Sequence, residues 1–143
     1  MVAVSSCLAG IVCRYNAVDI YNAELMNSIG EDYIPICPEL LAGFGVPRLP
    51  FEITGGSGED VLDGHARVIK KDGTDITDAV IAGAEKALQI CVESGAAKAY
   101  LRHGSPTCGC GHIYDGTFSG AMKPGNGVFT ALLNKNGIET VVV

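Results

Sequence analysis

Cysteine is the residue type in this chain best suited to chemistry. Two of the six cysteines are separated by one glycine in the turn "SPTCGCGH" (105–112), and no Cys-x-x-Cys pair occurs anywhere. Dithiol redox centres and structural zinc sites usually depend on that spacing. An iron–sulfur cubane needs only thiolates, which can come from distant loops, and three of them leave one iron open as a Lewis acid. The spacing alone leaves a nucleophile, a disulfide and a metal site as alternatives.

The elements that would position these cysteines follow from the apolar pattern. Short β-branched runs predict strands at 2–6, 33–36, 66–70, 98–102 and 138–143. Helical patterns run from Asn22 to Gly30, from Asp75 to Gly95, and from about Gly127 to Asn136, stopping at Gly137. The alternation predicts an α/β fold with a mainly parallel sheet. The Gly- and Pro-rich segment 43–64 has no clear period, so we expect an irregular loop over one end of the sheet.

Three cysteines follow predicted strands. Cys7 and Cys37 come directly after the runs 2–6 and 33–36, and Cys108 lies in the loop after 98–102. Loops that follow parallel strands meet at one edge of the sheet, where such folds bind ligands. We therefore expect these three thiols to converge at the C-terminal edge of the strands.

The other three cysteines favour a plainer reading. Cys91 lies on the apolar stripe of the long helix, which predicts a core position. Cys13 and Cys110 each lie within a few residues of an expected ligand, so a fourth ligand stays an alternative. A spare or packed thiol is the favoured interpretation for both.

Composition limits the class of protein. A chain of 143 residues, 48% of them hydrophobic, predicts one domain over residues 1–143. A net charge of −6 argues against a nucleic-acid polymer as partner and favours a small molecule. No stretch approaches the roughly 20 apolar residues of a membrane span, and the N-terminus lacks the basic region of an export signal. We expect a cytoplasmic protein with reduced thiols.

Four segments, "VSSCLAGIVCRYN", "ICPELLAGFGVPR", "GGSGEDVLDGHARV" and "SPTCGCGHIYDGTFSGAMKPGNGVFTALLNKNGIE", resemble the 2-thiouracil desulfurase (TudS) family. The resemblance runs over nearly the whole chain in the right order. It implies a Rossmann-like three-layer α/β fold and a [4Fe-4S] cluster held by three cysteines. The implied activity is removal of sulfur from thiolated pyrimidines.

Residue by residue, the resemblance implies that Cys7, Cys37 and Cys108 hold the cluster. It also implies that Glu39 and Ser105 line the substrate site. In the expected mechanism the substrate sulfur binds the open iron, water attacks the carbon, and sulfide is released. Glu39 would move the proton, provided that apolar neighbours favour its protonated form, and Ser105 would orient the ring or the water.

Two positions depart from the family pattern. The chain has Gly104 where a basic residue is common and Cys110 where a serine is common. If Cys110 or Cys13 supplied a fourth ligand, the protein would instead be a non-catalytic electron carrier or sensor, and a structural zinc protein is a further alternative. The sequence leaves two roles open for Arg48, holding an anionic ring or pairing with a surplus carboxylate. It decides neither the role of His103 nor the oligomeric state.

Overall fold

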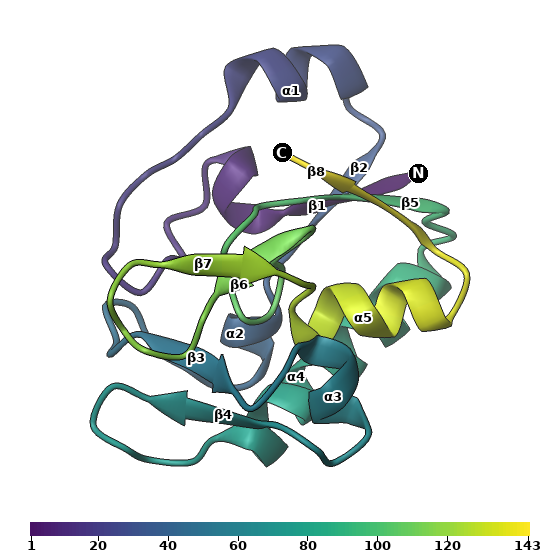
Figure 1. Ribbon diagram of the computed structural model, residues 1–143. Coiled ribbons are helices and arrows are strands. Elements are labelled where there is room, and N and C mark those ends of the chain that lie inside the picture. Colours follow the sequence, from purple (N-terminus) through teal and green to yellow (C-terminus); the bar gives the residue numbers. More distant parts are fainter.

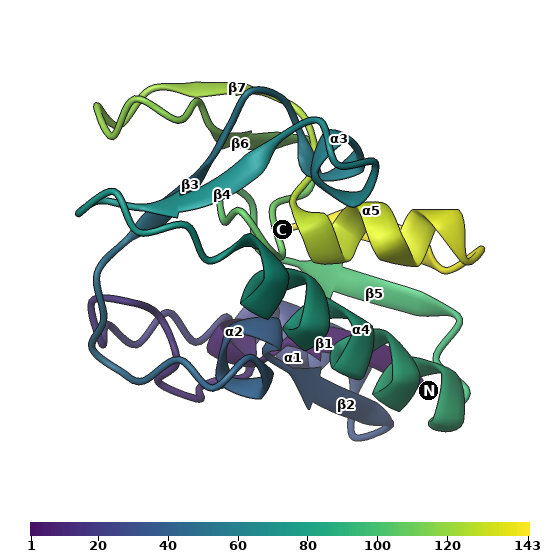
Figure 2. The same ribbon diagram turned by 90° about the horizontal axis from the view of Figure 1, so that it is seen from below.

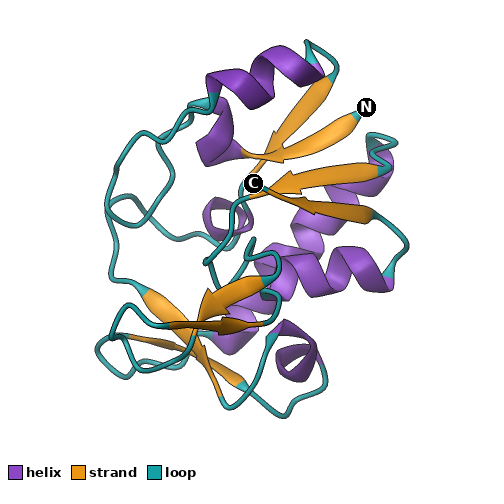
Figure 3. Cartoon of the chain, turned by 45° about the horizontal axis from the view of Figure 1, so that its top comes forward, coloured by secondary structure: helices purple, strands orange, loops and turns teal.

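Four parallel strands form the central sheet of the computed structural model, which describes residues 1–143. They are β1 (Val2–Ser5), β2 (Tyr33–Ile36), β5 (Lys98–Leu101) and β8 (Glu139–Val142), in the order β2-β1-β5-β8. Their arrows run side by side in Figure 3. All four coincide with predicted strands to within a residue at most ends, and the predicted α/β class with a parallel sheet is confirmed.

Helices cover both faces of this sheet (Figure 1). Successive side chains of a strand point to opposite faces. Accordingly, Val4 packs with Leu8 and Met26 under α1 (Ala23–Ile29), whereas Ala3 and Leu101 belong to the larger core on the other face. That larger core contains the apolar sides of α4 (Thr77–Glu93) and α5 (Val128–Lys135). The sheet is therefore the middle of three layers.

The helix boundaries follow local signals in two of three cases. The Asn22 side chain caps α1 by accepting from the Leu25 N–H at 2.9 Å, and Gly30 ends the helix as predicted. Helix α5 also has its predicted limits. Asp75 does not occupy the N-cap position of α4, which is held by Ile76. The Asp75 carboxylate instead accepts from the N–H and the hydroxyl of Thr77, the first residue of the helix.

None of the helices has both the length and the apolar content that crossing a bilayer requires.

Two antiparallel hairpins stand at one end of the sheet (Figure 2). The first pairs β3 (Phe51–Thr54) with β4 (Arg67–Lys70), and the second pairs β6 (His112–Tyr114) with β7 (Met122–Pro124). The predicted strand at 66–70 thus exists but lies outside the parallel sheet. The prediction of an irregular loop over 43–64 is wrong, because this segment contains β3 and the short helix α3 (Gly58–Leu62), capped by Ser57 and Asp60. These elements are too short to show a period against the surrounding Gly and Pro residues.

Candidate active site

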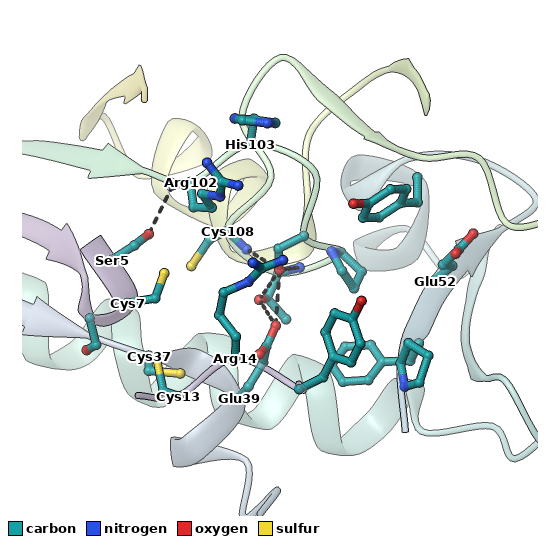
Figure 4. Close-up of a pocket in the computed structure, with 18 of the residues that line it drawn as sticks. Ser5, Cys7, Cys13, Arg14, Cys37, Glu39, Glu52, Arg102, His103 and Cys108 are labelled. Atoms are coloured by element: carbon teal, nitrogen blue, oxygen red, sulfur yellow. Dashed lines mark hydrogen bonds between the residues drawn. The ribbon is translucent and has the colours of Figure 1, made fainter. Parts of the chain in front are cut away.

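Three cysteines that follow strands surround one cavity. Cys7 lies in the single-turn helix η1 (Ser6–Ala9) directly after β1, and Cys37 lies between β2 and the short helix α2 (Pro38–Leu41). Cys108 lies in the turn that follows β5. All three line a cavity of about 310 Å³, and their side chains face it from different segments in Figure 4. The structure thus brings together the three thiols that the sequence places after strands.

The remaining cysteines separate into one that lines the cavity and two in the core. Cys13 lines the cavity and lies close enough to Cys7 and Cys37 for the three thiols to affect one another's pKa values. Cys110 is buried in the main core and does not line the cavity. Cys91 is fully buried on α4, as predicted. The favoured interpretation of a packed thiol therefore suits Cys110, whereas Cys13 belongs to the site.

The surroundings of two thiols favour their ionised form. The Cys13 thiol, together with the charges of Arg14 and Arg102, lowers the pKa of Cys7 to about 7 in spite of burial. For Cys37, the Cys13 hydrogen bond, the Leu40 N–H and Arg48 lower the pKa. Metal ligation needs thiolates, so both positions are prepared for it.

The other two thiols of the cavity hold their protons more tightly. Donation to Cys37 and Cys7, with burial, raises the pKa of Cys13. Burial also raises the pKa of Cys108, and only the Ser5 and Thr107 side chains oppose that effect. A bound metal would supply the positive charge that Cys108 lacks in its own surroundings.

Glu39 lines the same cavity as these thiols. It is the acceptor of a polar cluster that consists of Glu39, Arg48, Ser105 and Thr107. Its Oε1 accepts from the hydroxyls of Ser105 at 3.0 Å and Thr107 at 2.8 Å, and its Oε2 pairs with Arg48. The expectation of apolar surroundings is wrong, because these donors replace them and Leu40 is exposed to solvent. Positive charge and hydrogen bonds both favour the carboxylate over the acid.

Arg48 connects this carboxylate to the segment that carries Cys13. Its Nη1 donates to the carbonyl oxygens of Cys13 at 2.9 Å and Gly45 at 3.1 Å, and its backbone N–H donates to the Tyr15 carbonyl at 2.8 Å. The Arg48 side chain is only 8% exposed and its partner Glu39 13%. Pairing with a carboxylate was one of two roles that the sequence left open for Arg48, and it is the one that the structure has.

Ser105 fixes the turn that presents Cys108. Its hydroxyl oxygen accepts from the N–H groups of Thr107 at 3.1 Å and Cys108 at 3.3 Å while it donates to Glu39. Helix α5 holds the same turn from behind: the Val128 and Phe129 N–H groups donate to the Pro106 and Thr107 carbonyls, and the Thr130 hydroxyl donates to the Cys108 carbonyl at 3.1 Å. The polar cluster thus fastens the turn bearing Cys108 to the segments of Cys13 and Cys37.

Close backbone approach explains one glycine of this arrangement. A Cβ at Gly127 would collide with the carbonyl group of Thr107, because the start of α5 lies directly against the turn. Any side chain at this position would push the turn, and Cys108 with it, away from the cavity.

Comparison with known proteins places this geometry in context. The profile of the 2-thiouracil desulfurase family matches residues 2–143. The chain belongs to this family. An uncharacterised relative, YbbK of Bacillus subtilis (strain 168), is 44% identical over 142 residues, which is 99% of this chain and 94% of the relative. The solved structure of the [4Fe-4S]-dependent thiouracil desulfidase TudS superposes with a TM-score of 0.83 at 36% identity, over 99% of this chain and 89% of that one.

The donor set of this family member fits a cluster better than a single metal ion. No group of three His, Cys, Asp or Glu side chains has the geometry of a single-ion site. A zinc ion would need its ligands close together, because its bonds to sulfur are only about 2.3 Å long. Thiols spread around a cavity suit the larger cubane, and Cys110 does not line that cavity.

Aromatic residues form part of the cavity wall, which the sequence pattern did not indicate. They are Tyr15, Phe51, Tyr114 and Phe118, and Glu52 lines the cavity with them. Most of these residues come from the two hairpins, whose short strands gave little or no periodic signal. His103 lines the cavity near the thiols, and its Nδ1 lies 3.0 Å from the Val143 carbonyl oxygen.

Proposed function

We propose that this protein is a [4Fe-4S]-dependent desulfurase that hydrolyses the C=S group of a 2-thiouracil-like pyrimidine to C=O and sulfide. In this proposal Cys7, Cys37 and Cys108 hold the cluster, and Glu39 and Ser105 are the catalytic residues. The observation that carries it is the convergence of the three thiols on one cavity, beside the carboxylate and hydroxyls of the polar cluster, in a chain of the 2-thiouracil desulfurase family.

The cluster, when bound, supplies a Lewis-acidic iron that withdraws electrons from the thiocarbonyl carbon and accepts the departing sulfur. Three protein ligands leave one iron without a protein side chain. Cys13 lines the same cavity as a fourth thiol, and its pKa is raised by Cys37, Cys7 and burial.

Glu39 lines the cavity with the thiols, and the Ser105 and Thr107 hydroxyls hold its carboxylate in place. In the proposed mechanism this carboxylate, paired with Arg48, takes a proton from the attacking water. The overall reaction exchanges sulfur for oxygen without a change of oxidation state. The proton that Glu39 takes up is therefore free to go to a ring nitrogen or to the sulfide as the product forms.

Ser105 and Thr107 orient this carboxylate through their hydroxyl groups. Ser105 uses its proton on Glu39 and its two acceptor sites on the Thr107 and Cys108 N–H groups, so its part in the reaction is to hold the Glu39 carboxylate in place. The aromatic part of the cavity wall supplies flat apolar surface for a pyrimidine ring. We propose a free thiolated base or a similarly small molecule as substrate, and no nucleic-acid polymer.

Three further predictions, on the fold type, the number of domains and the cellular location, belong to the same proposal. The layers seen in Figure 1 support a Rossmann-like fold with the cysteines at the C-terminal edge of the strands. The continuous match to one family supports a single domain over residues 1–143. A cytoplasmic location, where the thiols stay reduced, remains a prediction from the sequence.

The decisive experiment is anaerobic reconstitution with iron and sulfide, followed by measurement of sulfide released from 2-thiouracil. We expect the wild type to bind about four irons and to release sulfide. Cys108→Ala should lose both, whereas Cys91→Ala removes a core thiol far from the cavity and serves as the matched control. A wild-type protein that binds the cluster but releases no sulfide from any thiolated pyrimidine would refute the proposed activity.

A further inference from the structure

The loop between β6 and β7 forms one wall of the cavity. Phe118 and Gly120 of this loop line the cavity. Phe118 has a φ of +57°, in the left-handed region that a bulky side chain rarely adopts. Such a conformation persists only where the surrounding structure holds it, and it often marks a functional position.

A buried carboxylate on the first hairpin holds this loop. Glu52 of β3 is 7% exposed, and its Oε1 accepts from the N–H groups of Gly116 at 2.9 Å and Phe118 at 3.2 Å. Figure 4 shows Glu52 well apart from Cys7, Cys37 and Cys108, on the far side of Glu39. The Glu52 side chain therefore reaches the loop backbone rather than the cluster ligands.

The loop is also fixed by close contacts of its own. A Cβ at Gly116 would lie 2.7 Å from the Ile53 carbonyl oxygen, so the loop backbone lies directly on β3. Within the loop, the Asp115 carboxylate accepts from the Thr117 N–H at 2.9 Å. Phe118 is thus presented by a backbone that is held on both sides.

We propose that Phe118 packs against the ring of the bound thiopyrimidine, and that Glu52 is a positioning residue that holds Phe118 there. This inference rests on the proposed function and adds the residue that recognises the ring. A carboxylate only accepts hydrogen bonds, so Glu52 can be the partner of two backbone N–H groups at once, those of Gly116 and Phe118. The hydrogen bonds to Glu52 help the fold to hold Phe118 at its positive φ before the substrate binds.

Four variants test this arrangement: Phe118→Gly, Glu52→Ala, Glu52→Gln and the control Ala17→Gly. Ala17 has the same φ of +57° but does not line the cavity, so its replacement relieves similar strain without touching the substrate. The kinetic measurements are kcat and KM for 2-thiouracil, and KM for thioacetamide, which is a thioamide without a ring. Calorimetry gives the dissociation constant of uracil. Iron content and Tm are measured for every variant.

We expect Phe118→Gly and Glu52→Ala to raise KM for 2-thiouracil at least about five-fold, the lower end of what loss of a base–aromatic contact produces. The dissociation constant of uracil should rise in parallel, while kcat, iron content and KM for thioacetamide change less than about two-fold. Glycine adopts positive φ without strain, so Phe118→Gly and Ala17→Gly should both keep the wild-type Tm or raise it. Glu52→Gln retains an acceptor oxygen and should restore near wild-type KM.

Equal KM values for 2-thiouracil in wild type and Phe118→Gly would overturn the proposal. A Glu52→Gln variant as impaired as Glu52→Ala would overturn it as well, because position 52 would then require a charge and not only a hydrogen-bond acceptor. If the wild type released no sulfide, the proposed function would fail by itself. Uracil binding would still decide the present inference, since it is supported only if uracil binds the wild type and binds Phe118→Gly more weakly.

Discussion

Replacing Glu39 by glutamine should cost the protein both stability and activity, for separable reasons. The Glu39–Arg48 pair is nearly inaccessible, with side chains 13% and 8% exposed. Removal of one partner leaves a buried, unpaired guanidinium, which typically costs about 3–5 kcal/mol. The entropy of unfolding of a 143-residue chain is roughly 0.3 kcal/mol/K at about 2.1 cal/mol/K per residue, so Tm should fall by about 10–17 °C.

The double variant Glu39→Gln/Arg48→Met separates the two effects. With both charges gone, the main penalty disappears, because apolar replacement of a buried pair is often close to neutral. What remains is the loss of the Arg48 hydrogen bonds to the Cys13 and Gly45 carbonyls, worth about 1 kcal/mol each. We therefore expect the double variant to lie within about 2–3 kcal/mol of the wild type and above the single variant.

Activity should not follow stability in this series. If Glu39 moves the proton, sulfide release should fall by about 10²–10⁴-fold in the single and in the double variant alike. The assay is urea unfolding of the three proteins, together with sulfide release at equal iron content. A Glu39→Gln variant as stable as the wild type would refute the electrostatic reasoning, and a double variant with restored activity would remove Glu39 from the chemistry.

Further expectations concern residues around the site. Cys110→Ala should keep wild-type iron content and sulfide release and lower Tm by a few degrees, because this thiol packs in the core and does not line the cavity. Thr130→Val should lower iron content as well as Tm by removing the hydroxyl that holds the Cys108 carbonyl, which a thermal scan and an iron assay would detect. Asp75→Asn should lower Tm at neutral pH, because Arg67 and Thr77 hold the pKa of the Asp75 carboxyl well below its usual value of 3.8. A depressed pKa stabilises the fold above pH 4 and this contribution is lost as the pH falls further, so the difference from wild type should shrink in acid.

The positions of the cysteines after strands could be predicted because the signal is local and the topology is restrictive. A β-branched run marks each strand, and successive parallel strands in α/β folds direct their following loops to one edge. That reasoning brings Cys7, Cys37 and Cys108 together without any knowledge of their contacts. The same logic fails for the strand at 66–70, because a run of residues shows that a strand exists but not which strand it pairs with.

Cys13 and Cys110 show where local reasoning stops. Each lies two to six residues from a ligand, so their sequence positions are similar. The chain after Cys7 turns back on itself, with the Ile11 N–H donating to the Ser6 carbonyl at 3.0 Å and Gly10 at a φ of +92°, and this turn returns Cys13 to the cavity. Cys110 follows Gly109, whose backbone packs on the Ser105 carbonyl, and it is buried without lining the cavity. The number of residues between two cysteines does not reveal such turn geometry.

Charge around the cavity also differs from the charge of the whole chain. The net charge of −6 argues against a broad phosphate-binding surface. Arginine side chains nevertheless lie close enough to lower the pKa of two of the proposed ligand thiols: Arg14 and Arg102 for Cys7, and Arg48 for Cys37. A cubane core of charge +2 with three thiolates carries one negative charge, and a thiolated ring adds electron density beside it. Burying that charge is costly unless cations lie near it. The arginines come from three separate segments, so the fold that collects the cysteines also collects the positive charge that an anionic cofactor requires.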